Sequence, residues 1–521
     1  MDRSDDQPLP GEVSKEAAVA ELERRRALAL GQGGPDRVAA HHAKGLLTAR
    51  ERIAALVDSS SFVEIGQLAH SDRPEVGERA PADASVTGVG TIEGRKVCVI
   101  AGDATVLAGT TGKVASRKQG QIMSLAARKG FPLVMLGDAN GGRLPDLLGS
   151  DFAASAGTDE GEHFLGIRVM EDRIPRATAI LGNAYGDPAF WAASSDFVSM
   201  TAAGSVALSG PALVTASTGA AATHAELGGE AMTARTTGVV HRVEPDEHAA
   251  IAAIVRFLSY LPSNATRSAP VSAPVGPGTS SETLSDIVPD RGRRGYDVRR
   301  VIDAVVDAET FFELRPTYGR SMVVGLARVE GQPVGVLANQ PKFRGGVLDA
   351  QALRKAIGLV DLCTAFGLPL VFLQDLPGVM IGLDAEREDI TGRVVELFTA
   401  LARSPVPKVT VVLRKAFGFG YIAMGGPALG TDFVVAWPNA EIGFMAADNA
   451  VRVVHHRRIA ETRAAEGEAA AEALANELER EMHSAFSPFT AASLAVIHDV
   501  IRPEETRRAV VDGLFVGTGY R

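Results

Sequence analysis

The clearest pattern in this chain is a run of apolar residues that leads into a glycine-punctuated turn. Val409 and residues 411–413 are apolar, as in a buried strand. Gly418 and Gly420 follow, and a small-residue segment that suits a helix start comes next. Glycine lets the backbone turn sharply and leaves N–H groups uncovered, and such groups can hold a negative oxygen. The pattern predicts a strand-to-helix turn, either an ordinary one or one that binds an oxyanion.

The rest of the chain begins with helical patterning and then changes to short strands. Residues 1–14 are polar, and we expect a disordered leader there. A segment rich in Ala, Glu and Arg follows and is closed by the glycines of residues 31–34, which is typical of a helix end. The predicted helices are 15–30, 46–57 and 466–481, the last despite Gly467, and the predicted strands are 85–92 and 96–101.

Short segments of the first half recur in the second half at a constant offset. Residues 130–134 recur as 367–371, and Asp138 recurs as Asp375, each 237 residues later. The same offset relates Gly94 to Gly331 and Lys118 to Lys355. Several ungapped matches at one offset indicate two copies of one domain. Each copy alternates strands with helices, which predicts an α/β fold with covered, largely parallel sheets.

These patterns divide the chain into two domains and a connecting segment. We predict an N-terminal domain over residues 1–262, a linker rich in Pro, Ser and Gly over 263–295, and a C-terminal domain over 296–521. Ligands of α/β folds bind beyond the carboxyl ends of strands. The glycine turns at 182–186 and 418–420 fall at such ends, one per copy. We therefore expect two facing oxyanion sites.

Composition and charge narrow the classes of function. The chain has 521 residues and a net charge of −10, which argues against a dominant nucleic-acid surface but permits a local basic patch for an anionic small molecule. Cys98 and Cys363 lie in apolar segments and are interpreted as small buried residues, and without a CxxC pair a structural zinc site is not expected. With a polar N-terminus and no run of about 18 apolar residues, we expect a cytoplasmic protein without a signal peptide or membrane span.

Longer motifs resemble a known family. They are similar to the carboxyltransferase (β) subunit of biotin-dependent acyl-CoA carboxylases, of the propionyl-CoA carboxylase type, from roughly Ala18 to the C-terminus. The strongest segments are 40–52, 259–264, 339–341, 346–349, 406–410, 414–418 and 436–441.

The resemblance implies two crotonase-like domains, an N-terminal half that binds the CoA thioester and a C-terminal half that receives biotin. It also implies a homohexamer in which each active site lies between halves of different chains. Biotin would be carried by a separate partner, because Thr233 stands where an attachment motif needs its lysine. The expected partners are a biotin carboxyl carrier and a biotin carboxylase, with acyl-CoA as substrate and no metal.

The implied reaction moves a carboxyl group from carboxybiotin to the α carbon of an acyl-CoA through an enolate. Paired backbone N–H donors in a water-poor site stabilise the two oxyanions involved. Alignment with the family places the thioester-side pair at Gly186 and Asp187 and the biotin-side pair at Phe419 and Gly420. The expected substrate-binding residues are Gly141, Gly142, Arg143, Tyr185, Trp191, Pro377, Gly378 and Ile422.

The chain departs from the family at both turns, where a Gly-Gly-Ala step is usual. The first turn reads Gly186-Asp187-Pro188 and the second Gly418-Phe419-Gly420. A carboxylate beside an enolate is unfavourable unless it points away, pairs with a cation, is neutralised or works as an acid. The family run Arg-Ile-Gln-Glu-Gly is replaced by residues 143–147, and Trp191 is larger than its counterpart. Ile422 stands where propionyl-type enzymes tend to carry an acid, which leans away from strict propionyl specificity.

Other polar residues have structural interpretations. We interpret His41 and His42 as packed at a helix start rather than as phosphate ligands. Asp138 and Asp375 are interpreted as turn caps rather than catalytic acids, and Lys118 and Lys355 as solvated rather than bound to CoA phosphates. Residues 455–458 form a charged run interpreted as solvated surface.

Three functions follow from these observations. The first is carboxyl transfer in an acyl-CoA carboxylase. The second is decarboxylation of a malonyl- or methylmalonyl-CoA-type substrate at the same enolate site, and the third is a non-catalytic ring subunit of a carboxylase complex. Asp187 and Phe419 are the residues that keep the last two open.

Overall fold

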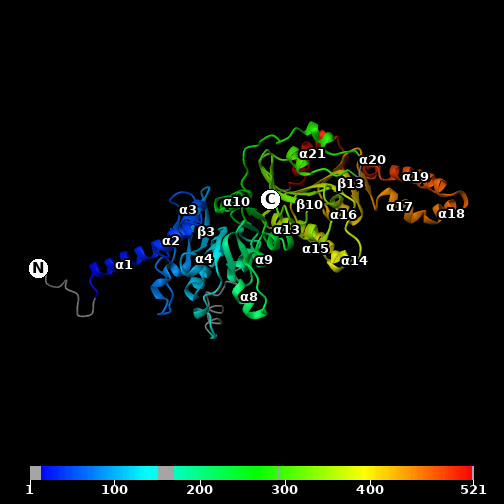
Figure 1. Ribbon diagram of the computed structural model, residues 1–521. Coiled ribbons are helices and arrows are strands. Elements are labelled where there is room, and N and C mark those ends of the chain that lie inside the picture. The colour runs from blue at the N-terminus through cyan, green and yellow to red at the C-terminus, as the bar shows by residue number, and fades with distance from the viewer. Residues whose placement is uncertain (1–12, 151–168, 291–293, 519–521) are drawn as a thin grey trace. The chain divides into compact units, whose positions relative to one another are not determined.

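The computed structural model describes residues 13–150, 169–290 and 294–518 (Figure 1). The chain divides into two compact units, Met1–Leu258 and Ser259–Arg521. Most of the expected disordered leader, residues 1–12, lies outside the described residues. The segment 263–295, expected to be a linker, falls within the second unit, and its Leu284 and Ile287 are buried in that unit's core.

The first unit is built on an eight-stranded sheet of order β1-β2-β3-β4-β5-β6-β8, with β7 paired to β5. β1–β3 pair antiparallel, and the strands from β3 onward pair parallel. The strands are β1 (Val63–Glu64), β2 (Ser85–Ile92), β3 (Arg95–Gly102), β4 (Leu133–Ala139), β5 (Arg176–Tyr185), β6 (Phe197–Thr201), β7 (Ser205–Ala207) and β8 (Arg242–Glu244). β2 and β3 confirm the predicted strands, β3 being one residue longer at each end.

Some helices of this part of the chain begin at side-chain caps. The side chain of Ser14 accepts a hydrogen bond from the N–H of Ala17 at the start of the first helix, which spans the predicted range. Thr48 and Glu51 form a capping box at α3. The helices are α1 (Lys15–Leu30), α2 (Pro35–His42), α3 (Ala49–Leu56), α4 (Lys113–Lys129), α7 (Asp187–Ser194), α8 (Pro211–Thr218), α9 (His224–Gly228) and α10 (Glu247–Tyr260).

The second unit repeats this design, with the order β9-β10-β11-β12-β13-β14-β16 and β15 paired to β13. The repeat confirms the predicted α/β fold of two duplicated domains. The strands are β9 (Phe312–Leu314), β10 (Met322–Val329), β11 (Gln332–Asn339), β12 (Leu370–Leu376), β13 (Lys408–Phe417), β14 (Phe433–Ala436), β15 (Glu441–Gly443) and β16 (Asp499–Val500). β13 is almost wholly buried, as its apolar run predicts.

The predicted helix 466–481 is found over most of its range as α19, which begins at Glu468. Gly467 adopts φ +90° and separates α18 from α19, so only the predicted start of the helix is corrected. Val451, Ile459, Ala471 and Leu478 then pack together between α17, α18 and α19, the orange helices of Figure 1. The helices are α11 (Leu284–Ile287), α12 (Arg299–Val305), α13 (Ala350–Phe366), α14 (Leu383–Arg387), α15 (Ile390–Arg403), α16 (Gly418–Ala423), α17 (Ala447–Val454), α18 (His456–Glu466), α19 (Glu468–Ala485), α20 (Pro488–Ser493) and α21 (Thr506–Gly517).

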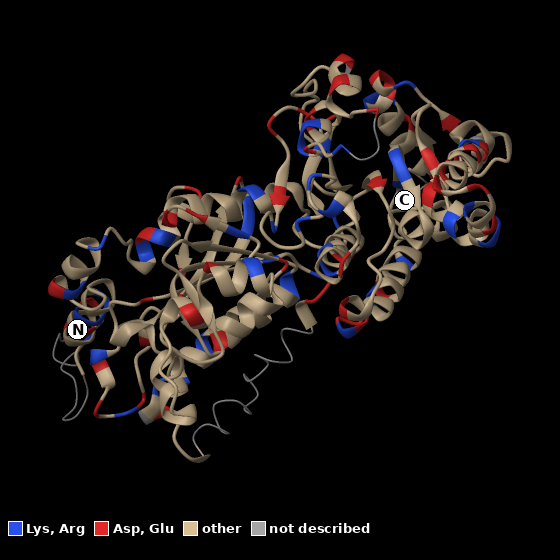
Figure 2. Ribbon diagram, turned by 45° about the vertical axis from the view of Figure 1, so that its right-hand side comes forward, with Lys and Arg blue, Asp and Glu red and all other residues tan. Residues whose placement is uncertain are grey.

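Charged residues of both signs are interspersed along each unit (Figure 2). Arg457 and Arg458 are exposed, which agrees with the solvated interpretation of residues 455–458. His41 and His42 close α2 rather than start a helix, so that prediction is corrected. Cys98 and Cys363 are both buried, as predicted.

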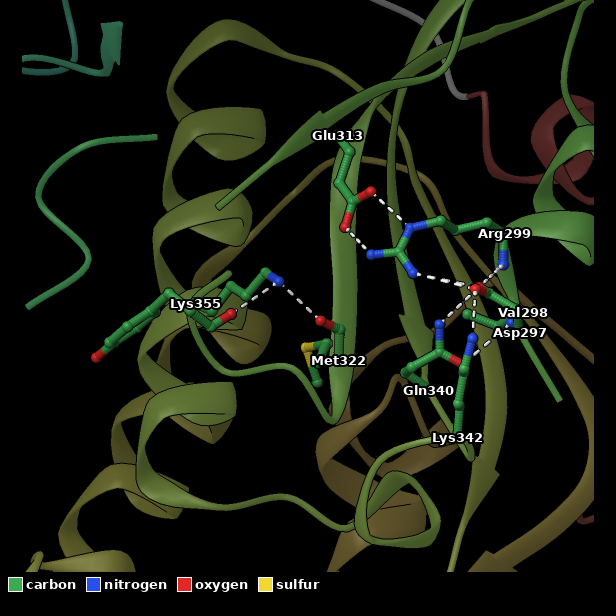
Figure 3. Close-up of polar contacts among 9 residues, drawn as sticks. Asp297, Val298, Arg299, Glu313, Met322, Gln340, Lys342 and Lys355 are labelled. Atoms are coloured by element: carbon green, nitrogen blue, oxygen red, sulfur yellow. Dashed lines mark hydrogen bonds and ion pairs between the residues drawn. The ribbon is translucent and has the colours of Figure 1, made fainter. Parts of the chain in front are cut away.

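The two related lysines are buried, which corrects the prediction of a solvated helix face. Lys118 Nζ donates to the carbonyls of Ala82 and Ser85, at 2.9 and 2.6 Å. In the second unit Lys355 Nζ donates to the carbonyls of Tyr318 and Met322, at 3.1 and 2.7 Å (Figure 3). Each lysine therefore ties its helix, α4 or α13, to backbone carbonyls near the start of a strand.

Lys355 leads to a prediction about the pH dependence of stability. Burial lowers its pKa to about 7, whereas an unfolded lysine titrates near about 10.4. Between these values the unfolded chain binds a proton that the folded chain does not, so the free energy of unfolding rises with pH. We expect urea unfolding to show a rise of roughly 1 kcal/mol per pH unit in this window that Lys355→Met lacks.

Lys342 supplies the matched control, because its side chain is 60% exposed in the same unit (Figure 3). Lys342→Met is expected to keep the wild-type pH slope. If Lys355→Met also keeps that slope, the buried ammonium does not titrate in this window and the interpretation fails.

Candidate active site

Two strand-to-helix turns occupy equivalent places in the two sheets. β5 ends at Tyr185, and Gly186 with φ +70° leads into α7. β13 ends at Phe417, and Gly418 with φ +60° opens α16. Positive φ at both positions is a conformation that glycine adopts without strain. Each sheet thus ends its central strand with the same sharp turn into a short helix.

The second turn presents two adjacent backbone donors. Within the described residues the N–H groups of Phe419 and Gly420 have no hydrogen-bond acceptor. The Phe419 side chain is 61% exposed. A Cβ at Gly420 would lie 2.6 Å from Leu376 Cδ1 and 3.0 Å from Gly378 Cα, so any larger residue would force these neighbours to move. These predicted residues therefore form a pair of N–H groups at a helix start, where a negative oxygen is stabilised.

The first turn differs from the second in its donors. The N–H of Gly186 donates to the carbonyl of Leu208 at 3.1 Å, which commits it to the connection after β7. Asp187 is half-buried at the first position of α7, where an acidic residue interacts favourably with the helix dipole. Pro188 follows and has no N–H. The Gly186–Asp187 pair expected from the sequence therefore has one member whose hydrogen already has a partner.

A second glycine segment runs beside each turn. The carbonyl of Gly141 accepts from the N–H of Thr111 at 3.0 Å, and that of Gly378 accepts from Leu348 at 3.1 Å. The two glycines have φ of +88° and +129°. A Cβ at Gly186 would lie 3.7 Å from Gly141 Cα. The structure thus brings Gly141 and Gly378, two predicted substrate-binding residues, next to the turns.

The other predicted substrate-binding residues are less uniform in their placement. Gly142 and Pro377 are exposed in the same glycine segments, and Ile422 is half-buried on α16. Trp191 is 5% exposed and packs in the first unit's core with Ile100 and Met123. The large side chain of Trp191 therefore packs in the hydrophobic core behind α7.

Arg143 and Tyr185 both have partners inside the protein. The guanidinium of Arg143 is buried, pairs with Asp83, and lies 3.1 Å from Asp146 Oδ2. The hydroxyl of Tyr185 lies 3.0 Å from Ser205 Oγ and hydrogen-bonds to His224. Both side chains therefore brace the loops around the first turn from within.

The strand-end aspartates are ion-paired and are not turn caps, so that interpretation is corrected. Asp138 Oδ2 lies 2.9 Å from Arg52 Nη1, and Arg52 also pairs with Glu247. Asp375 Oδ2 lies 2.9 Å from Arg414 Nη2. Burial raises the pKa of Asp375 above its usual value. Arg52 and Glu247 were not predicted from the sequence. The acidic residue at the strand end was the available signal, because a buried carboxylate needs a cation as its partner.

A pocket of about 780 Å³ lies next to the second glycine segment. The loop from Met380 to Gly382 and helix α14 line it, together with Arg344 and Asp349. Ile381 and Leu383 are among its most exposed members, at 87% and 78%. The pocket places a mixed apolar and charged surface directly after Gly378 in the chain.

Neither a metal site nor a membrane span is found in residues 13–150, 169–290 and 294–518. No group of three or more His, Cys, Asp and Glu side chains in these ranges could hold a metal ion. No helix among them has the length and hydropathy needed to cross a bilayer.

Comparison with known proteins gives consistent matches over nearly the full length. The carboxyl transferase domain family matches residues 40–516. The chain is 37% identical over 524 residues to the biotin-dependent acetyl-/propionyl-coenzyme A carboxylase beta5 subunit of Mycobacterium tuberculosis, covering 96% of this chain and 91% of the relative. It is 36% identical over 503 residues to the methylmalonyl-CoA carboxyltransferase 12S subunit of Propionibacterium freudenreichii, covering 96% and 94%.

A solved structure agrees with these sequence matches. The transcarboxylase 12S crystal structure, described as a hexamer with methylmalonyl-coenzyme A bound, superposes with a TM-score of 0.89 at 34% identity. The match covers 98% of both chains.

Proposed function

Because this chain belongs to the carboxyl transferase family, as a carboxyltransferase subunit of biotin-dependent acyl-CoA carboxylases, we propose that its two turns are the two oxyanion sites of carboxyl transfer. The protein is an enzyme, and it moves a carboxyl group to the α carbon of an acyl-CoA. The biotin belongs to a separate carrier protein.

The observation that carries this proposal is the pair of N–H groups at Phe419 and Gly420. They have no acceptor within the described residues, they are adjacent, and they start a helix at the end of a buried strand. Such preorganised donors stabilise negative charge as it develops on an oxygen. The arrangement fits a ureido oxygen, which needs hydrogen-bond donors and no side-chain acid.

A bound carboxybiotin would supply the carboxyl group as CO2, and the ureido nitrogen freed by that loss would take the α proton of the substrate. The chain's own residues position the reacting groups. Phe419 and Gly420 donate to the biotin-side oxygen, and the Gly378 segment sets the wall opposite them. In the first unit the α7 turn, with Asp187 at its start, holds the thioester oxygen, and Gly141 lies beside that turn. With each oxygen held by the turn of one unit, the reaction needs no side-chain nucleophile.

The finer features of the proposal concern partners and substrate. We propose that the chain works with a biotin carboxylase and a biotin carboxyl carrier. We also propose that it assembles as a homohexamer, which is the assembly described for the similar transcarboxylase 12S protein. The relatives' names indicate a short-chain acyl-CoA such as acetyl- or propionyl-CoA. A cytoplasmic location stays a prediction from the sequence.

The test is a transfer assay with the purified full-length chain. A carboxylated biotin carrier and acetyl- or propionyl-CoA are mixed with the protein, and malonyl- or methylmalonyl-CoA formation is measured. We expect product only when carrier and protein are both present. Loss of CO2 from methylmalonyl-CoA without a carrier would support a decarboxylase instead, and failure to bind any CoA ester would support a non-catalytic subunit.

A further inference from the structure

We propose that Pro188 withholds one of the two backbone donors from the acyl-CoA oxyanion site and thereby limits the rate of carboxyl transfer. This inference rests on the proposed function of the two turns. It concerns a difference between the halves of one chain, so the second half serves as an internal reference for the first.

The equivalence of positions follows from strand register. In the first sheet Ala184 pairs with Ala139 and Tyr185 with Ala207. In the second sheet the corresponding pairs are Ala416 with Leu376 and Phe417 with Gly443. Both sets of pairs align the last residues of β5 and β13. Counting on from these strand ends, Asp187 corresponds to Phe419 and Pro188 to Gly420.

The donors at equivalent positions are therefore unequal. At Phe419 and Gly420 the second unit offers two N–H groups without an acceptor in the described residues. Position 188 of the first unit has none, because the proline ring replaces the amide hydrogen. The pair first expected from the sequence, Gly186 and Asp187, is one residue out of register with the pair in the other half.

Neighbouring amides of the first turn do not replace the missing donor. The N–H of Gly186 donates to Leu208 O at 3.1 Å. Those of Ala189 and Phe190 both donate to Gly186 O, at 2.9 and 3.2 Å. The turn is left with at most one backbone donor for a thioester oxygen, that of Asp187.

Pro188 is compatible with the fold, so we expect it to lower the rate of carboxyl transfer and not the stability of the protein. Proline is well tolerated in the first turn of a helix, where the N–H lacks an intrahelical partner. Pro188 is buried at the second position of α7 and fits the turn. A missing oxyanion donor lowers kcat by about 10²- to 10³-fold. An interaction that is stronger with the enolate than with the ground-state thioester affects kcat more than KM.

The experiment restores the amide with Pro188→Ala in the full-length chain. We expect kcat for transfer from a carboxylated carrier to propionyl-CoA to rise about 10²-fold with KM nearly unchanged. Pro188→Gly, which also restores the N–H, is a second variant in case the first folds poorly. Pro211→Ala is the matched control, because Pro211 also starts a helix of this half, α8, and its replacement is expected to leave kcat unchanged.

A binding measurement separates this inference from the proposed function. A CoA thioether that carries a nitronate in place of the enolate is expected to bind Pro188→Ala about 10²-fold more tightly than wild type, while CoA itself binds both equally. If wild type transfers carboxyl groups but Pro188→Ala neither accelerates transfer nor binds the nitronate more tightly, the inference is overturned and the function stands. If neither chain transfers a carboxyl group, the proposed function is overturned, and the nitronate affinities still decide whether Pro188 withholds a donor.

Discussion

Replacing Phe419 by proline is expected to slow carboxyl transfer by about 10²- to 10³-fold while the protein stays folded. The substitution deletes one N–H from the pair at residues 419 and 420 and so weakens stabilisation of the biotin-side oxyanion. This loss corresponds to roughly 3–4 kcal/mol of transition-state free energy. The fold tolerates proline there because the position lies in the first turn of α16 and its side chain is exposed.

Phe419→Ala is the matched control, since it removes the aromatic ring and keeps the amide. The rate of Phe419→Ala is expected to stay within about tenfold of wild type, because both N–H donors are kept. Losing one donor would slow transfer by more than about tenfold. Both variants are compared by kcat and KM for transfer from a carboxylated carrier to acyl-CoA. Equal losses in the two variants would assign the effect to the ring, and an unimpaired Phe419→Ala with an unimpaired Phe419→Pro would refute the backbone pair.

Replacing Arg52 by methionine is expected to destabilise the first unit by about 3–5 kcal/mol. Arg52 is fully buried and pairs with Asp138 and Glu247, which come from β4 and α10. Glu247 also accepts a hydrogen bond from the N–H of Leu47 at 2.9 Å. Removing the guanidinium leaves two buried carboxylates without their shared cation, which is far more costly than removing an exposed pair.

The unfolding of the two units can be separated because the chain has only two tryptophans, Trp191 in the first unit and Trp437 in the second. In a Trp437→Phe background, urea unfolding followed by fluorescence reports on the first unit. Arg26→Met is the control, since Arg26 pairs with Glu23 on the surface, and its loss is expected to cost less than about 1 kcal/mol. Similar midpoints for the two variants would contradict the buried network as a source of stability.

The elements that local sequence predicts well are stabilised by interactions between residues that are close together in the sequence. The first helix is found at its predicted range because its composition favours a helix and Ser14 caps it. β2 follows its predicted range because a turn at Gly94 closes a hairpin with β3. The repeat at an offset of 237 residues was sufficient to predict two copies of one fold.

The predictions that failed concern charged side chains, and one glycine shifts the start of a predicted helix. Lys118 and Lys355 were expected to be solvated, because a charged residue on a helix is most often exposed. Their acceptors, such as Met322, lie some 33 residues away in sequence, so no local pattern reveals them. Gly467 ends a helix that the surrounding Ala and Glu residues favour, because its φ of +90° lets the chain reverse between α18 and α19.

The amino-acid sequence by itself determined the duplicated α/β fold, the glycine turn at the end of each central strand, and membership of the carboxyltransferase family. Only the tertiary structure decided which N–H groups of those turns are available. The carbonyl of Leu208, which follows the neighbouring strand β7, accepts a hydrogen bond from the amide of Gly186. Strand register, which is a long-range property, makes Pro188 the counterpart of Gly420. Every residue except proline carries the same backbone N–H group. Whether that group can bind a substrate oxygen therefore depends on whether folding places another acceptor beside it.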